Sequence, residues 1–238
     1  HLYALAAAGR RNGIHTVGVV RGEMNDSAML KDAAAFGMTL IFWSRQQFRE
    51  YKSLAENSEA LRSLKEQVGD FYFVPEGGSN GLGALGCKAI SLATEQTLNG
   101  DFTDICMASG TGATLAGVAA GLAANKHAWG LSVLKGEGSM AGDISNFIGQ
   151  LCPHDRDNWT LQSGYHGGGY AKLSTELLDF MRGFEEASGL LLDPVYTLKL
   201  CWGVEAMAKR EVWRPGSHLV LVHSGGLQGR RGYKILDA

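Results

Sequence analysis

The alternation of helical and extended segments constrains the fold of this chain more than any other feature of its sequence. Segments rich in β-branched and aromatic residues predict strands, and segments with helical periodicity lie between them. The predicted strands cover residues 16–20, 39–43, 71–74, 105–108, 129–134 and 219–223. The predicted helices cover residues 2–11, 28–36, 48–67, 82–98, 115–124, 175–187 and 198–209. This order is typical of βαβ units, so we expect an α/β fold with parallel sheets.

The composition narrows the class of protein. With 45% hydrophobic and 19% charged residues, the 238-residue chain can bury a core in each of two domains. We expect a small, incomplete α/β domain at 1–82 and a large α/β domain at 83–238. A net charge of −2 argues against a nucleic-acid partner, and no apolar run reaches the ~20 residues of a membrane span. The four cysteines are far apart and lack metal-ligand spacing, which predicts no metal site and reduced thiols in a cytoplasmic protein.

The best local signal for a binding site is the segment Ser109-Gly110-Thr111-Gly112-Ala113-Thr114, between a predicted strand and a predicted helix. Small and hydroxylated residues there bring several backbone N–H groups to the positive end of the helix, which suits a phosphate. The segment matches neither GxxxxGK[ST] nor GxGxxG. Among phosphate ligands a single phosphate monoester therefore fits best, but from these residues alone an ordinary strand-to-helix turn is favoured over a phosphate site.

Three other segments each have a chemical interpretation and a simpler structural one. The glycine-rich residues 75–86 allow close approach to a ligand or form a hinge. Ser224, at a predicted strand end, could hydrogen-bond a ring nitrogen or belong to a turn. Tyr196, beside a predicted helix start, could stack on a planar cofactor and move protons, or be a packing residue. Tyr165 and Tyr170 have the same two interpretations.

Five segments in order together resemble one enzyme family: PEGGSNGLGALG (75–86), ASGTGATLAG (108–117), GYAKL (169–173), LLDPVYTLK (191–199) and HSGGLQG (223–229). The chain is similar, over essentially its whole length, to the D-cysteine desulfhydrases and 1-aminocyclopropane-1-carboxylate (ACC) deaminases. The resemblance implies a fold type II pyridoxal-phosphate enzyme with two open twisted α/β domains, as in the tryptophan synthase β subunit. It also implies a homodimer that acts on a small amino acid.

The resemblance further implies roles for individual residues. Those that would bind the phosphate are Gly110, Thr111, Gly112, Ala113 and Thr114. Tyr196 would stack on the pyridine ring, Tyr170 would lie near the substrate, and both count as catalytic residues. Either Thr197 or Ser224 would face the ring nitrogen. Because the deaminases carry a glutamate after the stacking tyrosine and the desulfhydrases a hydroxyl, Thr197 favours β-elimination of D-cysteine to pyruvate, ammonia and sulfide; ring-opening deamination is the competitor.

The chain departs from the family at its beginning. The lysine that forms the Schiff base belongs to an SGNKxRK-like motif, and a Gln-Ser-Asn motif precedes the helix that begins here at His1; neither motif is present. We interpret Lys88, Lys135 and Lys199 as solvated charges and assign no replacement. Either the sequence lacks part of a working enzyme, which we favour, or the protein is a relative that binds ligand without turnover.

A nucleotide-binding α/β protein is a third and weaker alternative. It predicts an acidic ribose ligand ~20 residues beyond the glycine loop. Position 134 is a leucine and Glu137 lies close to it in the sequence, so this test leaves the alternative open.

Overall fold

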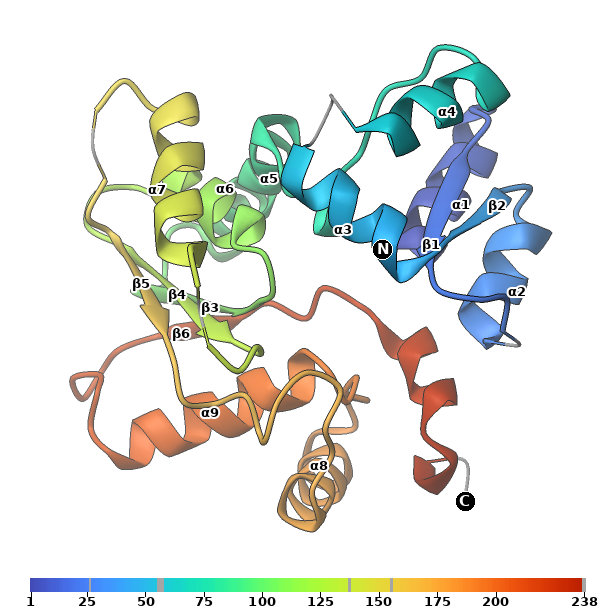
Figure 1. The fold of residues 1–238 in the computed structure, drawn as a ribbon. Helices are drawn as coiled ribbons and strands as arrows, with labels where there is room; N and C mark the ends of the chain where they lie inside the picture. Colours follow the sequence, from blue (N-terminus) through green and yellow to red (C-terminus); the bar gives the residue numbers. More distant parts are fainter. Residues whose placement is uncertain (26, 55–57, 137, 155, 237–238) are drawn as a thin grey trace. The chain divides into compact units, whose positions relative to one another are not determined.

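The computed structural model describes residues 1–25, 27–54, 58–136, 138–154 and 156–236. The chain forms two compact units (Figure 1): unit 1 contains His1–Val74 and the residues from Arg231 onward, and unit 2 contains Pro75–Arg230. The units divide between Val74 and Pro75, whereas the predicted domain boundary follows residue 82, and that boundary stays a prediction. Glu137, considered above as a ribose ligand, lies outside the described residues.

Unit 1 is built on two parallel strands. Its elements in chain order are α1 (Leu2–Asn12), β1 (Val17–Arg21), α2 (Ala28–Ala35), β2 (Thr39–Trp43), α3 (Arg45–Leu54) and α4 (Glu59–Val68). The strands pair in register from Val17 opposite Thr39 to Arg21 opposite Trp43. One buried cluster contains Ala6 and Ala33 of α1 and α2, and a second contains Trp43 and residues of α4. The alternation predicted from the sequence is therefore confirmed here.

Two predictions in unit 1 are wrong. The helix expected over 48–67 is interrupted before α4, because Ser58 is extended and its hydroxyl accepts a hydrogen bond from the Leu61 N–H at 3.3 Å as the helix N-cap; residues 55–57 of that prediction lie outside the described residues. Residues 71–74 do not form a strand. Among the described residues the two-stranded sheet consists of β1 and β2 alone, and residues 71–74 pair with neither of them.

Unit 2 contains a four-stranded parallel sheet in the order β5-β4-β3-β6. Its strands are β3 (Asp104–Ser109), β4 (His127–Ser132), β5 (Trp159–Gln162) and β6 (Leu219–Leu221). Its helices are α5 (Gly81–Leu98), α6 (Ala113–Gly121), α7 (Met140–Leu151), α8 (Thr175–Ser188) and α9 (Thr197–Lys209). A short 3₁₀ turn, η2 (Glu76–Gly78), precedes α5; η3 (Leu227–Gly232) begins in unit 2 and ends in unit 1, and η4 (Lys234–Leu236) belongs to unit 1. The sequence did not predict α7 or β5.

Helices cover both faces of this sheet (Figure 1). Alternate residues of β3 point to opposite sides, so that Ile105 and Met107 join the core with α6 and α7, while Cys106 joins the core with α9. Between α5 and α6 the backbones approach closely, because a Cβ on Gly117 would lie 2.1 Å from the carbonyl oxygen of Ala84. None of the described helices is both long and apolar enough to span a bilayer.

Candidate functional site

The segment between β3 and α6 forms the centre of the candidate site. Gly112 is the N-cap of α6, has φ +87°, and supplies no side-chain capping bond. A Cβ at this position would lie 2.6 Å from Cγ1 of the buried Ile144, so both the backbone angle and the space require glycine. The first N–H groups of an α-helix lack intrahelical acceptors. The start of α6 therefore has free N–H groups of the kind that can bind an anion, and the phosphate site expected there stays a prediction.

The glycine-rich residues 75–86 pack against this segment within unit 2. A Cβ on Gly77 would lie 2.9 Å from the Thr111 side chain, and the Ser79 hydroxyl donates to the Thr111 carbonyl at 3.3 Å. The side chain of Asn80 caps α5 by accepting from the Gly83 N–H at 2.8 Å. The close approach that these glycines allow is therefore an approach to the loop before α6.

Tyr196 is far from this loop in the sequence but lies against it in the structure. An ideal Cβ on Gly110 would be 3.4 Å from Cε1 of Tyr196. The Tyr196 hydroxyl donates to the Tyr170 hydroxyl at 3.5 Å, and the two rings stand at 74° with centroids 6.2 Å apart. Burial raises the pKa of Tyr196 well above its usual value, and the bond to Tyr170 raises it further. The Tyr196 phenol therefore keeps its proton at neutral pH.

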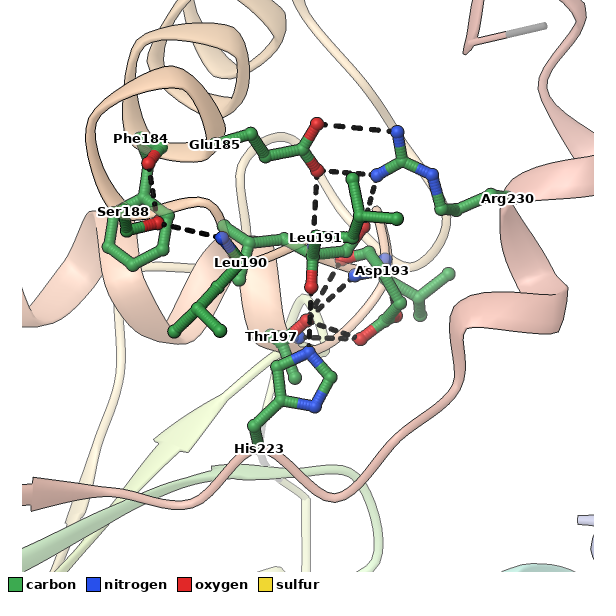
Figure 2. Close-up of polar contacts among 11 residues, drawn as sticks. Phe184, Glu185, Ser188, Leu190, Leu191, Asp193, Thr197, His223 and Arg230 are labelled. Carbon is green, nitrogen blue, oxygen red and sulfur yellow. Dashed lines mark hydrogen bonds and ion pairs between the residues drawn. The ribbon is translucent and has the colours of Figure 1, made fainter.

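Asp193 fixes the backbone that carries Tyr196. Its Oδ1 accepts from the N–H groups of Val195 and Tyr196 at 2.9 and 2.8 Å, and its Oδ2 accepts from the N–H and hydroxyl of Thr197, both at 2.8 Å. The Asp193 side chain is thus the acceptor for the orphan donors at the start of α9 (Figure 2). This capping role of Asp193 was not predicted, although an Asp-Pro pair before a helix is a known capping signal.

A second set of contacts holds the segment that leads to Asp193 (Figure 2). Glu185 of α8 accepts from the Leu192 N–H at 2.8 Å, Arg230 donates to the Leu192 carbonyl at 2.7 Å, and the two side chains pair at 2.5 Å. The ring of His223 donates to the Leu191 carbonyl at 2.8 Å. Three separate elements therefore position the short segment between α8 and α9.

The two candidates for the ring nitrogen differ in their surroundings. Thr197 is buried, its hydroxyl proton goes to Asp193 Oδ2, and its oxygen accepts from the Asp193 N–H at 2.8 Å. Ser224 is exposed and makes no side-chain hydrogen bond to any residue that the structure describes. It belongs to a segment that touches residues 191–193, since a Cβ on Gly226 would lie 3.3 Å from Asp193 Cγ.

The prediction that Lys199 is a solvated charge is wrong. Its side chain is 1% exposed, and Nζ donates to the Gly169 carbonyl at 2.6 Å. Burial lowers the pKa of the Lys199 ammonium, while the Asp193 carboxylate opposes that shift. Lys135 is exposed, as expected, and Lys88 is half-buried. The apolar neighbours of Lys199 in the sequence, Leu198 and Leu200, were the available signal that this helix is buried.

Comparisons with known proteins agree on one family. The family described as "Pyridoxal-phosphate dependent enzyme" matches residues 1–225. The chain is 31% identical over 207 residues to "Bifunctional D-cysteine desulfhydrase/1-aminocyclopropane-1-carboxylate deaminase, mitochondrial" of Arabidopsis thaliana, which covers 81% of this chain and 51% of that protein. It is 26% identical over 238 residues to "D-cysteine desulfhydrase" of Klebsiella pneumoniae, which covers 95% of this chain and 73% of that protein. A crystal structure of an ACC deaminase homologue shares the fold, with a TM-score of 0.86 and 24% identity over 100% of this chain and 74% of that one.

Proposed function

Because this chain belongs to the pyridoxal-phosphate-dependent enzyme family, we propose that it catalyses β-elimination from D-cysteine, which yields pyruvate, ammonia and sulfide. The observation that carries the proposal is the closeness of Tyr196 to the loop before α6, since a Cβ on Gly110 would lie 3.4 Å from Cε1 of Tyr196. A planar phosphorylated cofactor needs an aromatic ring and such a loop next to each other. The proposed substrate follows from Thr197, which occupies the position where the deaminases carry a glutamate.

The start of α6 fits the phosphate of the cofactor. The N-cap Gly112 leaves the first N–H groups of the helix without a side-chain acceptor, and the positive end of the helix favours an anion. Gly110 leaves the space beside the Tyr196 ring unfilled. The Cys87 thiol donates to Thr114 Oγ1 at 3.8 Å, so the Thr114 hydroxyl keeps its own proton to donate. We assign the phosphate to the segment from Gly110 to Thr114.

Ser224 is the better of the two candidates for the ring nitrogen. A hydroxyl has one proton to donate, and the Thr197 proton is already given to Asp193. The Ser224 hydroxyl has no such commitment among the described residues. We therefore assign Ser224 to the ring nitrogen, Thr197 to the start of α9, and Tyr196 to the face of the ring.

The chemistry divides between the cofactor and the two phenols. Pyridoxal phosphate, when bound, withdraws electrons from the α-carbon of an amino acid and so makes loss of the α-proton and of a β-substituent possible. Tyr196 holds its proton firmly because burial and the bond to Tyr170 raise its pKa, and with Tyr170 it would offer hydrogen-bond donors to a bound substrate. We further propose that the protein is a homodimer, which light scattering in solution tests.

The test is to express the full-length protein and to measure three products with three substrates. The visible absorbance of a lysine-linked cofactor should accompany the purified protein and should disappear on borohydride treatment. Sulfide, ammonia and 2-oxo acid should be released from D-cysteine, with less from L-cysteine and none from ACC. Cofactor binding without release of any product from the three substrates would refute the assignment as a lyase and support a binding protein.

ACC deamination is the second candidate function. The name of the Arabidopsis thaliana relative includes both activities, so the two reactions can share one protein of this family. Ammonia and 2-oxobutyrate from ACC without sulfide from D-cysteine would favour this second candidate and overturn the use made of Thr197.

A further inference from the structure

The loop that carries Tyr170 has little rigidity of its own. Three consecutive glycines precede the tyrosine, and all have positive φ: +57° at Gly167, +90° at Gly168 and +129° at Gly169. Glycine has more backbone freedom to lose on ordering than any other residue. The hydrogen bonds inside the loop are short-range, such as the Gly168 N–H to His166 Nδ1 at 3.1 Å and the Lys172 N–H to the Gly169 carbonyl at 3.2 Å. Its position must therefore be set by contacts with neighbouring elements.

Lys199 supplies such a contact from α9. Its ammonium donates to the carbonyl of Gly169, the residue immediately before Tyr170, and its Cε is 3.6 Å from the place of a Cβ on Gly167. This carbonyl is the one hydrogen-bond acceptor of Lys199 Nζ within the described part of the chain. Lys199 also follows Tyr196 by three residues, which is close to one helical turn. One helix end thus carries one phenol and anchors the loop of the other.

The burial of this lysine has a cost that packing alone does not explain. An ammonium removed from water loses hydration that one carbonyl only partly replaces. An apolar side chain of the same length would fill the space without that loss. A buried charge held against the carbonyl that precedes Tyr170 therefore points to a functional reason for its position.

We propose that Lys199 is a positioning residue, which holds the Gly167–Gly169 loop so that Tyr170 stands within hydrogen-bonding distance of Tyr196. The inference rests on the proposed function, because it assigns Lys199 to the two phenols of that same site. Lys199 itself touches neither substrate nor cofactor. It acts through the backbone of Gly169.

The test compares Lys199→Met with Lys209→Met in the full-length protein. Methionine matches the length of lysine without its charge, and Lys209 lies on the same helix with its side chain 72% exposed. Loss of a charge-assisted hydrogen bond predicts a fall in kcat/KM on the order of tenfold to a hundredfold for Lys199→Met. The midpoint of thermal unfolding should stay unchanged or rise. Lys209→Met should change neither quantity measurably, and Lys199→Arg, which keeps a donor, should restore part of the activity.

A double-mutant cycle separates positioning from a general structural role. If Lys199 acts through Tyr170, then Lys199→Met should cost less than about twofold further in a Tyr170→Phe background, since interacting residues are non-additive. Losses that multiply would overturn the inference, as would a thermal midpoint that falls together with activity.

Hydrogen exchange distinguishes failure of this inference from failure of the proposed function. Amides of residues 164–172 should exchange faster in Lys199→Met, while those of α9 should not. Unchanged exchange in the loop would overturn the inference even if the enzyme is active. If the unsubstituted protein binds no cofactor and shows no turnover, the proposed function is refuted. Faster exchange of the loop amides in Lys199→Met would in that case still support the anchoring role of Lys199.

Discussion

Replacement of Gly112 by alanine is expected to destabilise unit 2 and to weaken cofactor binding. At φ +87° an alanine is strained by about 1–2 kcal/mol. Its Cβ would also lie 2.6 Å from Ile144 Cγ1 and 3.3 Å from Met140 Cγ, well inside the ~3.5–4.0 Å of a normal carbon contact. Both neighbours are buried, so relief requires movement of α7 at an overpacking cost of about 1–3 kcal/mol. The total loss is therefore about 2–5 kcal/mol.

The assay is urea unfolding followed by circular dichroism, with Gly183→Ala as the matched control. Gly183 lies within α8, and a Cβ there would meet no atom within 4 Å, so alanine should stabilise the protein by about 0.5–1 kcal/mol. Cofactor titration of Gly112→Ala should show an affinity at least about tenfold weaker, because the amides at the start of α6 must move with the strained residue. A Gly112→Ala variant within ~0.5 kcal/mol of the unsubstituted protein, roughly the error of such a comparison, would refute the reasoning.

Three further predictions concern the surroundings of the site. Asp193→Ala removes the acceptor for three backbone N–H groups and the Thr197 hydroxyl, so the free energy of unfolding should fall by about 2 kcal/mol. The control is Ser217→Ala, at a half-buried residue whose N–H closes a turn with the Arg214 carbonyl, and it should leave this free energy unchanged. The lowered pKa of Lys199 means that, as pH rises, the folded state loses this proton at a lower pH than the unfolded state does. The free energy of unfolding of the unsubstituted protein, relative to that of Lys199→Met, should therefore increase as pH rises toward about 10.5. A difference in urea unfolding that stays flat across alkaline pH would contradict this prediction. Burial raises the pKa of the thiols of Cys106 to about 12 and Cys201 to about 11, so maleimide labelling read by mass spectrometry should modify the half-buried Cys87 and Cys152 first.

Local sequence patterns predicted the secondary structure correctly where the patterns of neighbouring segments are consistent with one another. The run from Ile105 to Ala108 predicted a strand and the small residues after it predicted a turn into a helix, and both are confirmed as β3 and α6. The structure places Tyr196 next to the Gly110 loop, and the cofactor site expected there stays a prediction. Four-residue β5 was missed because its strand conformation depends on pairing with β4, which no local pattern records.

The sequence by itself determined the alternation that makes the sheets parallel, the turn from β3 into α6, and the family. These depend on side-chain periodicity and on glycine φ angles, which neighbouring residues decide. Only the tertiary structure decided that the Phe71–Val74 run has no strand partner, that Asp193 takes up the Thr197 proton, and that Lys199 is buried against Gly169. Each of these is a contact between segments or a burial, and its energy depends on atoms that the local sequence does not contain.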